Sequence, residues 1–254
     1  MDNFLLSVLI PSYNEMANLQ KGTLDKIKSY LSKKRKNFSY EVIVVDDGSD
    51  DGSREFVEKF VKENHNEFRI LKNNHLGKAG AVTSGVLHAK GDFILFTDMD
   101  QATPIEEIEK LLPYFNNGYD VVIGSRSSKR RGAPFTRLIM AQGMITLRSM
   151  LVGLNGIKDT QCGFKVFTKK SAHDVFSKIS KIHHGFSKIK GSSVTAGFDV
   201  ELLYIAGNMG FKIKEVPVEW LYVETRRVSP IRDSLEGLLE LFKIRSNILK
   251  GIYS

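Results

Sequence analysis

The chain has 254 residues, 42% of them apolar and 26% charged, and is therefore long enough for one large domain with a substantial core. Its single cysteine, Cys162, excludes an internal disulfide framework, and no run of eighteen apolar residues predicts a membrane span. The formal net charge of +8 favours an anionic partner. We expect no nucleic-acid binding, because zinc-ligand spacings and RNA-binding aromatic motifs are missing, and no signal peptide.

Strands and helices alternate along the chain, which predicts an α/β sheet covered by helices on both faces. The expected strands are 6–10, 41–45, 68–71, 93–97, 120–123, 163–167 and 213–217. The expected helices are 18–33, 53–63, 79–88, 105–115, 134–151, 169–176, 198–209 and 231–250. Ligands of such sheets bind outside the carboxyl ends of the strands, so these ends are the first candidates for a site.

The first expected strand ends at Pro11, and the turn that follows carries an aromatic and an acidic side chain. Tyr13 and Glu15 could face a crevice in which a ring stacks and a polar edge is held. The alternative is an ordinary strand-to-helix turn, with Asn14 or Asn18 as the helix cap. Both interpretations remain open at this turn.

The second expected strand ends at Val45 and runs into a series of acids that begins at Asp46 and Asp47. Acids repel a diphosphate, so they suit hydrogen bonds from a base or a ribose, although Asp51 or Ser53 could simply begin the next helix. The sequence Gly-X-Gly-X-X-Gly is missing, which counts against a dinucleotide-binding enzyme.

A glycine-rich turn follows the third expected strand and contains Gly77, Lys78 and Gly80. Glycine permits close backbone approach, the following helix points its N-terminus at the crevice, and Lys78 adds positive charge. A tight turn with a solvated lysine is an equally good interpretation.

The fourth expected strand, 93–97, is apolar throughout and is followed by Asp98 and Asp100. Residues at i and i+2 point the same way, and two such carboxylates suit Mg²⁺ or Mn²⁺ together with phosphate oxygens. The alternative is a polar strand end that leads into a helix capped by Thr103, with Pro104 at its first position.

In this order, the motifs Pro-Ser-Tyr-Asn-Glu, Val-Asp-Asp-Gly-Ser, Gly-Lys-Ala-Gly-Ala, Gly-Asp-Phe and Asp-Met-Asp resemble the inverting glycosyltransferases of family two. The resemblance implies the GT-A fold, a Rossmann-like mixed sheet with helices on both faces. It also implies that the nucleoside of the donor is held by Pro11, Tyr13, Glu15, Val45 and Asp47. The implied ligands of the metal (Mg²⁺ or Mn²⁺) and diphosphate are Asp98 and Asp100, with the Met99 backbone between them and Lys78 nearby.

The second half of the chain carries Gly-Ser-Arg, Asp-Thr-Gln-Cys-Gly-Phe-Lys, Phe-Asp-Val-Glu-Leu-Leu and Val-Pro-Val-Glu-Trp. These motifs are similar to the dolichyl-phosphate β-glucosyltransferase branch, a close relation of dolichyl-phosphate mannose synthase. The branch implies UDP-glucose as donor and a polyprenyl phosphate as acceptor. Ala141, Ala102 and Val223 depart from the mannose-synthase pattern and favour the glucosyl branch.

Further roles follow from this resemblance. Arg126 and Arg137 are expected to hold the acceptor phosphate, and Arg226 and Arg227 to lie on a loop that closes over the diphosphate. Asp199 stands where relatives with sugar acceptors carry a general base. We expect it to orient the acceptor or the sugar, with Glu201 as a structural partner, although it could simply cap a helix.

Two segments suggest attachment to a membrane surface. Residues 134–154 could form an interfacial helix within a catalytic domain of residues 1–228, or an ordinary core-facing helix. Residues 229–254 carry apolar residues at helical spacing together with Lys and Arg, and predict a C-terminal amphipathic helix. We therefore expect a cytoplasmic protein on the inner face of a membrane, with 183–196 as a polar loop that touches headgroups.

Two other functions stay open. One is a family member that uses GDP-mannose or a saccharide acceptor; the other is a non-catalytic nucleotide-sugar-binding protein. The sequence predicts no oligomeric state.

Overall fold

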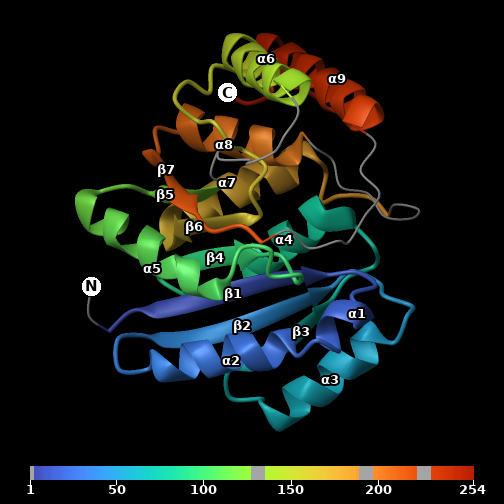
Figure 1. Ribbon diagram of the computed structural model, residues 1–254, viewed down its shortest axis with the longest axis vertical. Helices are drawn as coiled ribbons and strands as arrows, with labels where there is room; N and C mark the ends of the chain where they lie inside the picture. The colour runs from blue at the N-terminus through green and yellow to red at the C-terminus, as the bar shows by residue number, and fades with distance from the viewer. Residues whose placement is uncertain (1–2, 127–134, 189–196, 222–229) are drawn as a thin grey trace.

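A seven-stranded mixed sheet forms the centre of the protein in a computed structural model, which describes residues 3–126, 135–188, 197–221 and 230–254. The strand order is β3-β2-β1-β4-β6-β5-β7, and β6 alone of these seven runs antiparallel to its neighbours (Figure 1). The strands are β1 Leu5–Ser12, β2 Ser39–Asp46, β3 Phe68–Lys72, β4 Phe93–Thr97, β5 Val121–Arg126, β6 Phe164–Thr168 and β7 Ile213–Val218. The expected mixed α/β sheet is confirmed.

Helices cover both faces of this sheet. The α-helices are α1 Met16–Leu19, α2 Thr23–Lys33, α3 Ser53–Glu63, α4 Gly77–His88, α5 Ile108–Leu111, α6 Phe135–Val152, α7 Lys169–Ile182, α8 Phe198–Asn208 and α9 Pro230–Leu249. Two 3₁₀ helices, η1 Ile105–Glu107 and η2 Leu112–Asn117, flank α5.

The sheet separates two apolar clusters, because side chains alternate between its faces. In β1, Leu6, Val8 and Ile10 belong to one cluster and Leu9 to the other. Such a strand has no solvated face, which explains why its sequence is a continuous apolar run instead of an alternating one.

Several element boundaries differ from the sequence prediction. The helix expected over 18–33 is two helices, because Gly22 lies between them in the left-handed conformation (φ 74°). The helix expected over 105–115 is instead α5 between two 3₁₀ pieces, and Thr103 does not cap it. The amphipathic pattern of α7 continues to Ile182, beyond the expected end, and Thr168 accepts a hydrogen bond from the Ser171 amide at its start.

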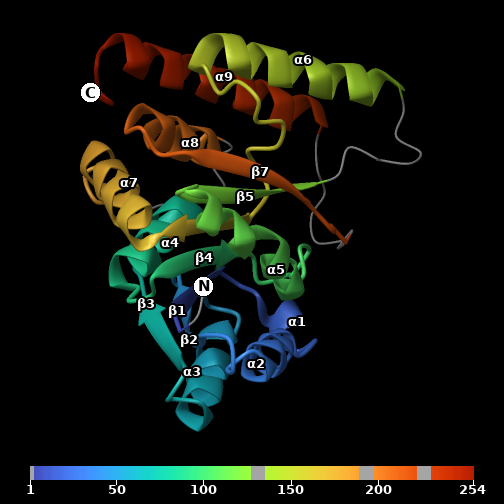
Figure 2. The same ribbon diagram turned by 90° about the vertical axis from the view of Figure 1, so that its left-hand side faces the viewer.

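Helices α6 and α9 lie side by side as an additional layer over α8 (Figure 2). Leu241 and Ile244 of α9, and Tyr253 after it, are buried in the same apolar cluster as α8. None of the helices in the described ranges is long and apolar enough to cross a membrane.

Candidate active site

The polar residues singled out in the sequence meet at one edge of the sheet. Because β1, β2, β4 and β5 are parallel to one another, they end there, and the antiparallel β6 begins there. Thr97 at the end of β4 lies opposite Phe164 at the start of β6, so Asp98 reaches Gly163. A Cβ added to Gly163 would stand 1.9 Å from Asp98 Oδ2. A side chain at position 163 would therefore displace the Asp98 carboxylate.

Asp98 and Asp100 follow β4 as expected, and a third charged group joins them. Lys78 Nζ, from the first turn of α4, donates a hydrogen bond of 2.6 Å to Asp98 Oδ1. Asp100 Oδ1 accepts from the Ala102 amide at 3.0 Å. Burial raises the pKa of Asp100, and the nearby Asp98 carboxylate raises it further. A pair of carboxylates under mutual repulsion is stabilised by a cation placed between them.

The donor set of this pair fits a hard divalent cation. Within the part of the chain that the structure describes, no third His, Cys, Asp or Glu joins the two aspartates. Mg²⁺ and Mn²⁺ accept such a site, because they complete their shell with phosphate oxygens and water. Gln101, with φ 50°, turns its side chain back to Thr97 Oγ1 and the Asp98 carbonyl, so it braces the loop.

Lys78 is a fixed positive charge beside the aspartate pair. Burial alone would lower the pKa of Lys78, but the carboxylates of Asp98, Asp199 and Asp100 together raise it above its ordinary value. The ammonium therefore stays protonated throughout the physiological range. It lies in the first turn of α4, where the helix dipole also favours an anion.

Asp47 and Tyr13 lie near the same edge, and both contact the turn before α4. Asp47 accepts hydrogen bonds from the Leu76 and Gly77 amides at 2.8 and 2.7 Å. Burial raises the pKa of Asp47 despite these bonds. The Tyr13 ring stacks on His75 with ring centroids 4.2 Å apart. His75, which the sequence reasoning passed over, thus belongs to the region predicted to hold the nucleoside.

The other residues predicted to hold the nucleoside are backbone or structural positions. Pro11 pairs with Val45 in the β1–β2 ladder, and the Val45 side chain is completely buried. The Met99 side chain is buried too, so Val45 and Met99 could reach a ligand only through their backbone. The Glu15 carboxylate accepts a 2.5 Å hydrogen bond from Asn18 Nδ2.

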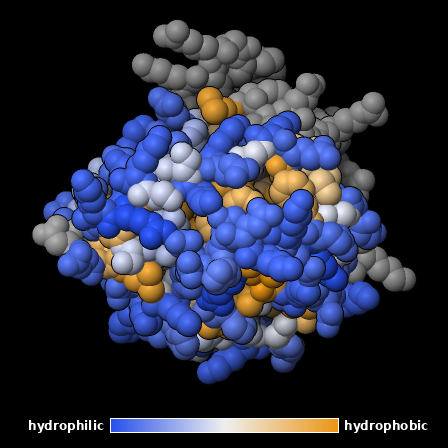
Figure 3. All heavy atoms as spheres, turned by 90° about the horizontal axis from the view of Figure 1, so that it is seen from below, coloured by the Kyte–Doolittle hydropathy of each residue, from blue (hydrophilic) through white to orange (hydrophobic). Residues whose placement is uncertain are grey.

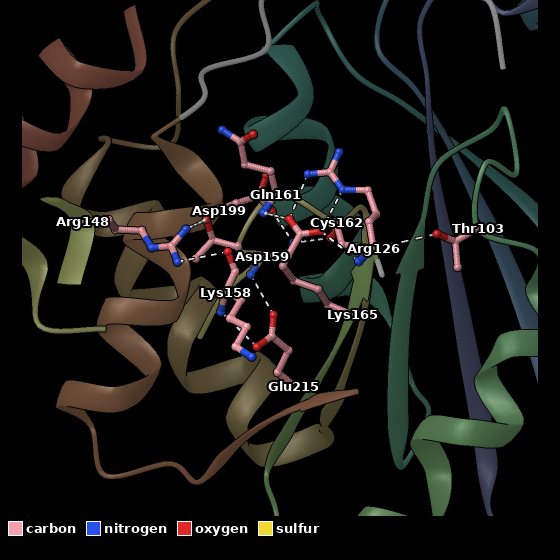
Figure 4. Close-up of polar contacts among 11 residues, drawn as sticks. Thr103, Arg126, Arg148, Lys158, Asp159, Gln161, Cys162, Lys165, Asp199 and Glu215 are labelled. Carbon is pink, nitrogen blue, oxygen red and sulfur yellow. Dashed lines mark hydrogen bonds and ion pairs between the residues drawn. The ribbon is translucent and has the colours of Figure 1, made fainter. Parts of the chain in front are cut away.

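Arg126, at the end of β5, is held by a carboxylate of the following motif. Its Nε and Nη2 donate to the two oxygens of Asp159 at 2.7 and 2.8 Å, and its backbone amide donates to the same side chain at 2.9 Å (Figure 4). Glu215 of β7 accepts hydrogen bonds from the Lys158 and Asp159 amides. The guanidinium predicted to meet the acceptor phosphate is therefore fixed in one orientation.

Arg148 joins α6 to this loop and is almost completely buried. Its Nη1 donates to Thr160 Oγ1 at 3.0 Å, and its Nη2 donates to the Ile157 and Lys158 carbonyls (Figure 4). The sequence reasoning treated Arg148 as a polar interruption of an apolar helix. A polar residue at a position where the helical pattern expects an apolar one was the available signal.

Asp199 lies in the first turn of α8 but does not cap it. Lys165 Nζ donates to Asp199 Oδ1 at 2.6 Å and to the Cys162 carbonyl at 2.5 Å. The expected partner Glu201 has other contacts, since it bonds His183 Nε2 and the Tyr253 hydroxyl at 2.7 and 2.6 Å. These bonds also correct the expectation that His183 is a solvated loop residue.

A cavity of about 360 Å³ opens between α4, α7, α8 and α9. Lys78, His183 and Glu201 line it together with Glu240 and Lys243 of α9. The aspartate pair and this cavity therefore share one lysine. Arg226 and Arg227, the side chain of Arg137, and most of the expected loop 183–196 lie outside the described residues.

Residues 7–176 match the family model described as Glycosyl transferase family 2, which covers more than half of the chain. The chain belongs to this family. It is 33% identical over 270 residues to the dolichyl-phosphate beta-glucosyltransferase of Dictyostelium discoideum, a match that covers 100% of this chain and 77% of the relative. It is 34% identical over 265 residues to the human protein of the same name, covering 98% and 77%. The branch that the sequence motifs indicated is thus confirmed.

Solved structures agree on the fold. Mannosyl-3-phosphoglycerate synthase from Rubrobacter xylanophilus superposes with a TM-score of 0.62 at 17% identity, covering 98% of this chain and 74% of that one. A mannosyltransferase from Pyrobaculum calidifontis, in complex with GDP-Man and Mn²⁺, gives 0.62 at 18% identity, covering 95% and 64%. The expected GT-A class is confirmed.

Proposed function

We propose that this protein is a metal-dependent, inverting glycosyltransferase that moves glucose from UDP-glucose to a polyprenyl phosphate. The names of its relatives give the sugar and the type of acceptor. The observation that carries the metal and the diphosphate is the group formed by Asp98, Asp100 and Lys78 where β4 ends. Two acids and one base, held together at the ligand-binding edge of the sheet, match a metal–diphosphate complex in charge.

The donor would lie across the ends of β1, β2 and β4. Tyr13 and His75 offer aromatic faces to the base, and Asp47 and Glu15 stand beside them. Asp98 and Asp100 would hold Mg²⁺ or Mn²⁺, which would neutralise negative charge on the departing diphosphate. Lys78 adds a second positive charge at that point, fixed before the substrate arrives. Arg226 and Arg227 are proposed to close over the same group.

The acceptor needs placement more than deprotonation. A phosphate monoester has its second pKa near ~6, so it arrives ionised and already nucleophilic. Arg126, oriented by Asp159, is the described guanidinium best placed to receive it, and we assign Arg137 to the same phosphate. An arginine fork suits a phosphate because it donates two parallel hydrogen bonds.

The transfer assay uses purified protein, radiolabelled UDP-glucose, polyprenyl phosphate and Mn²⁺ or Mg²⁺. We expect label in the lipid phase from the unaltered protein and at least ~10²-fold less from Asp100→Ala, which removes one proposed metal ligand. Asp174→Ala is the control, because Asp174 makes only a surface ion pair with Lys170 in α7. Lipid that stays unlabelled with the unaltered protein would contradict the proposed acceptor.

The acceptor lipid implies contact with a membrane, and we propose α9 as the contact surface. Leu235, Leu239, Phe242 and Leu249 are each more than half exposed and follow one stripe along the helix. At 100° per residue, this stripe lies opposite the buried Ile244. Lys243 and Lys250 border it on one side and Arg245 on the other, an arrangement that fits an anionic lipid surface. The opposite end of the molecule is mostly hydrophilic (Figure 3).

A further inference from the structure

Lys165 is a completely buried lysine in β6, inside the sheet. Its neighbours across the ladder are Phe96 of β4 and Ile123 of β5. The ammonium lies 5.0 Å from the centre of the Phe96 ring and donates hydrogen bonds to Asp199 Oδ1 and the Cys162 carbonyl (Figure 4). A buried ammonium is costly unless it is paired, so this lysine requires Asp199.

Asp199 stands beside the reacting groups. Its carboxylate interacts electrostatically with Lys78 of α4 and Arg126 of β5, the two cations assigned above to the donor and the acceptor. Lys165 of β6 completes the positive charges around it, while Glu201 of α8 is engaged by His183 and Tyr253. The Asp199 side chain remains 10% exposed at this edge of the sheet.

A carboxylate in this place could take a proton from a hydroxyl acceptor. An ammonium at 2.6 Å opposes that role, because a cation bonded to a carboxylate favours the ionised form and makes the carboxylate a weaker base. The same hydrogen bond fixes the orientation of the side chain. Asp199 therefore has the position of a general base but not its freedom.

We propose that Lys165 is a specificity-determining residue, which acts by keeping Asp199 from serving as a general base. Glucose then passes only to an acceptor that arrives ionised, and not to a hydroxyl group or to water. This inference rests on the proposed function, since it concerns the acceptor of the same reaction. Lys165 is a positioning residue: it touches Asp199, and neither the donor nor the acceptor.

Removal of Lys165 should permit a side reaction. Asp199 would accept a proton from water, the water oxygen would bond to C1 of glucose, and the bond between C1 and the diphosphate oxygen would break. UDP would leave with the electron pair, so the products are glucose, UDP and one proton. This reaction consumes UDP-glucose without any lipid acceptor.

The experiment measures UDP release from UDP-glucose in the presence of Mn²⁺ and the absence of acceptor. It compares the unaltered protein with Lys165→Met, Asp199→Asn and the double variant Lys165→Met/Asp199→Asn, in which no charge is left unpaired. Lys158→Met is the matched control, because Lys158 is exposed on the same loop and contributes its backbone to the contacts there. Circular dichroism and thermal unfolding confirm that each variant is folded.

We expect Lys165→Met to raise hydrolysis at least ~10-fold, a part of the ~10²–10⁴-fold that a general base supplies. The gain should increase with pH, because a carboxylic acid must ionise before it accepts a proton. It should disappear in the double variant and be absent from Lys158→Met. A folded Lys165→Met that hydrolyses no faster, or a double variant that keeps the gain, would overturn the proposal.

Asp199→Asn tests the proposal even if Lys165→Met does not fold. With Asp199 already inactive as a base, transfer to polyprenyl phosphate should fall less than ~5-fold and keep its pH profile. A loss of ~10²-fold or more would show that Asp199 is the base and that the proposal is wrong. Failure of the proposed function is a separate result, because it appears as unlabelled lipid with the unaltered protein.

Discussion

Gly163 occupies a position where the Asp98 carboxylate leaves no room for a side chain. We expect Gly163→Ala to move that carboxylate and lower transfer activity at least ~10-fold, because catalysis depends on small displacements. Mn²⁺ affinity, measured by calorimetry, should fall with it. Gly207→Ala in α8 is the control: no heavy atom lies within 4 Å of the added Cβ, so activity should be unchanged. Equal activity of both variants would contradict this account.

The ion pair of Arg126 and Asp159 predicts a pH dependence of stability. Burial alone would raise the pKa of Asp159, but the bonds from Arg126 outweigh it and hold this pKa below its ordinary 3.8. A carboxyl whose pKa is depressed in the folded state stabilises the fold above its unfolded pKa and loses that contribution as the pH falls through the folded value.

Asp159→Asn should therefore be less stable than the unaltered protein by about 1–3 kcal/mol at pH 7. The difference should shrink as the pH falls below 3.8, where Asp159 of the unaltered protein takes up its proton. Urea unfolding at pH 7 and near pH 3 gives both values. A difference that is the same at both values would contradict the proposed stabilisation by ionised Asp159.

At the scale of elements, Arg148 connects α6 with the loop between α6 and β6. We expect Arg148→Met to cost about 2–4 kcal/mol of unfolding free energy, because the Ile157 carbonyl and Thr160 lose a buried donor. The measurement is chemical denaturation. Arg245→Met is the matched control: its exposed 3.5 Å contact with the Leu151 carbonyl should be worth less than about 0.5 kcal/mol.

The sequence predicted most elements by type but not how they end. The strand 93–97 and the helix 53–63 were predicted with their observed bounds, because a continuous apolar run and an amphipathic repeat are strong local signals. The break at Gly22 and the 3₁₀ turns around α5 were missed. Both depend on how a segment packs against its neighbours, and a propensity pattern does not contain that information.

At the scale of the whole molecule, the apolar stripe of α9 predicts binding to anionic vesicles. Leu239→Asp should weaken that binding about 10-fold or more, because it removes apolar area and adds a charge that the lipid repels. Co-sedimentation with phosphatidylserine vesicles measures the change. Asn116→Asp makes the same change in net charge on the exposed η2, and it should bind almost as well as the unaltered protein. Equal losses in both variants would leave net charge alone as the cause of binding.

The sequence by itself determined the class of fold, the family and the aspartate pair after β4, since these follow from local patterns and from motifs in a fixed order. Only the tertiary structure decided what each charge is paired with. Asp159 with Arg126, Lys165 with Asp199 and His183 with Glu201 join residues 18 to 34 positions apart. Such pairs form where strand register and helix packing bring two elements together, and a one-dimensional pattern does not specify that distance.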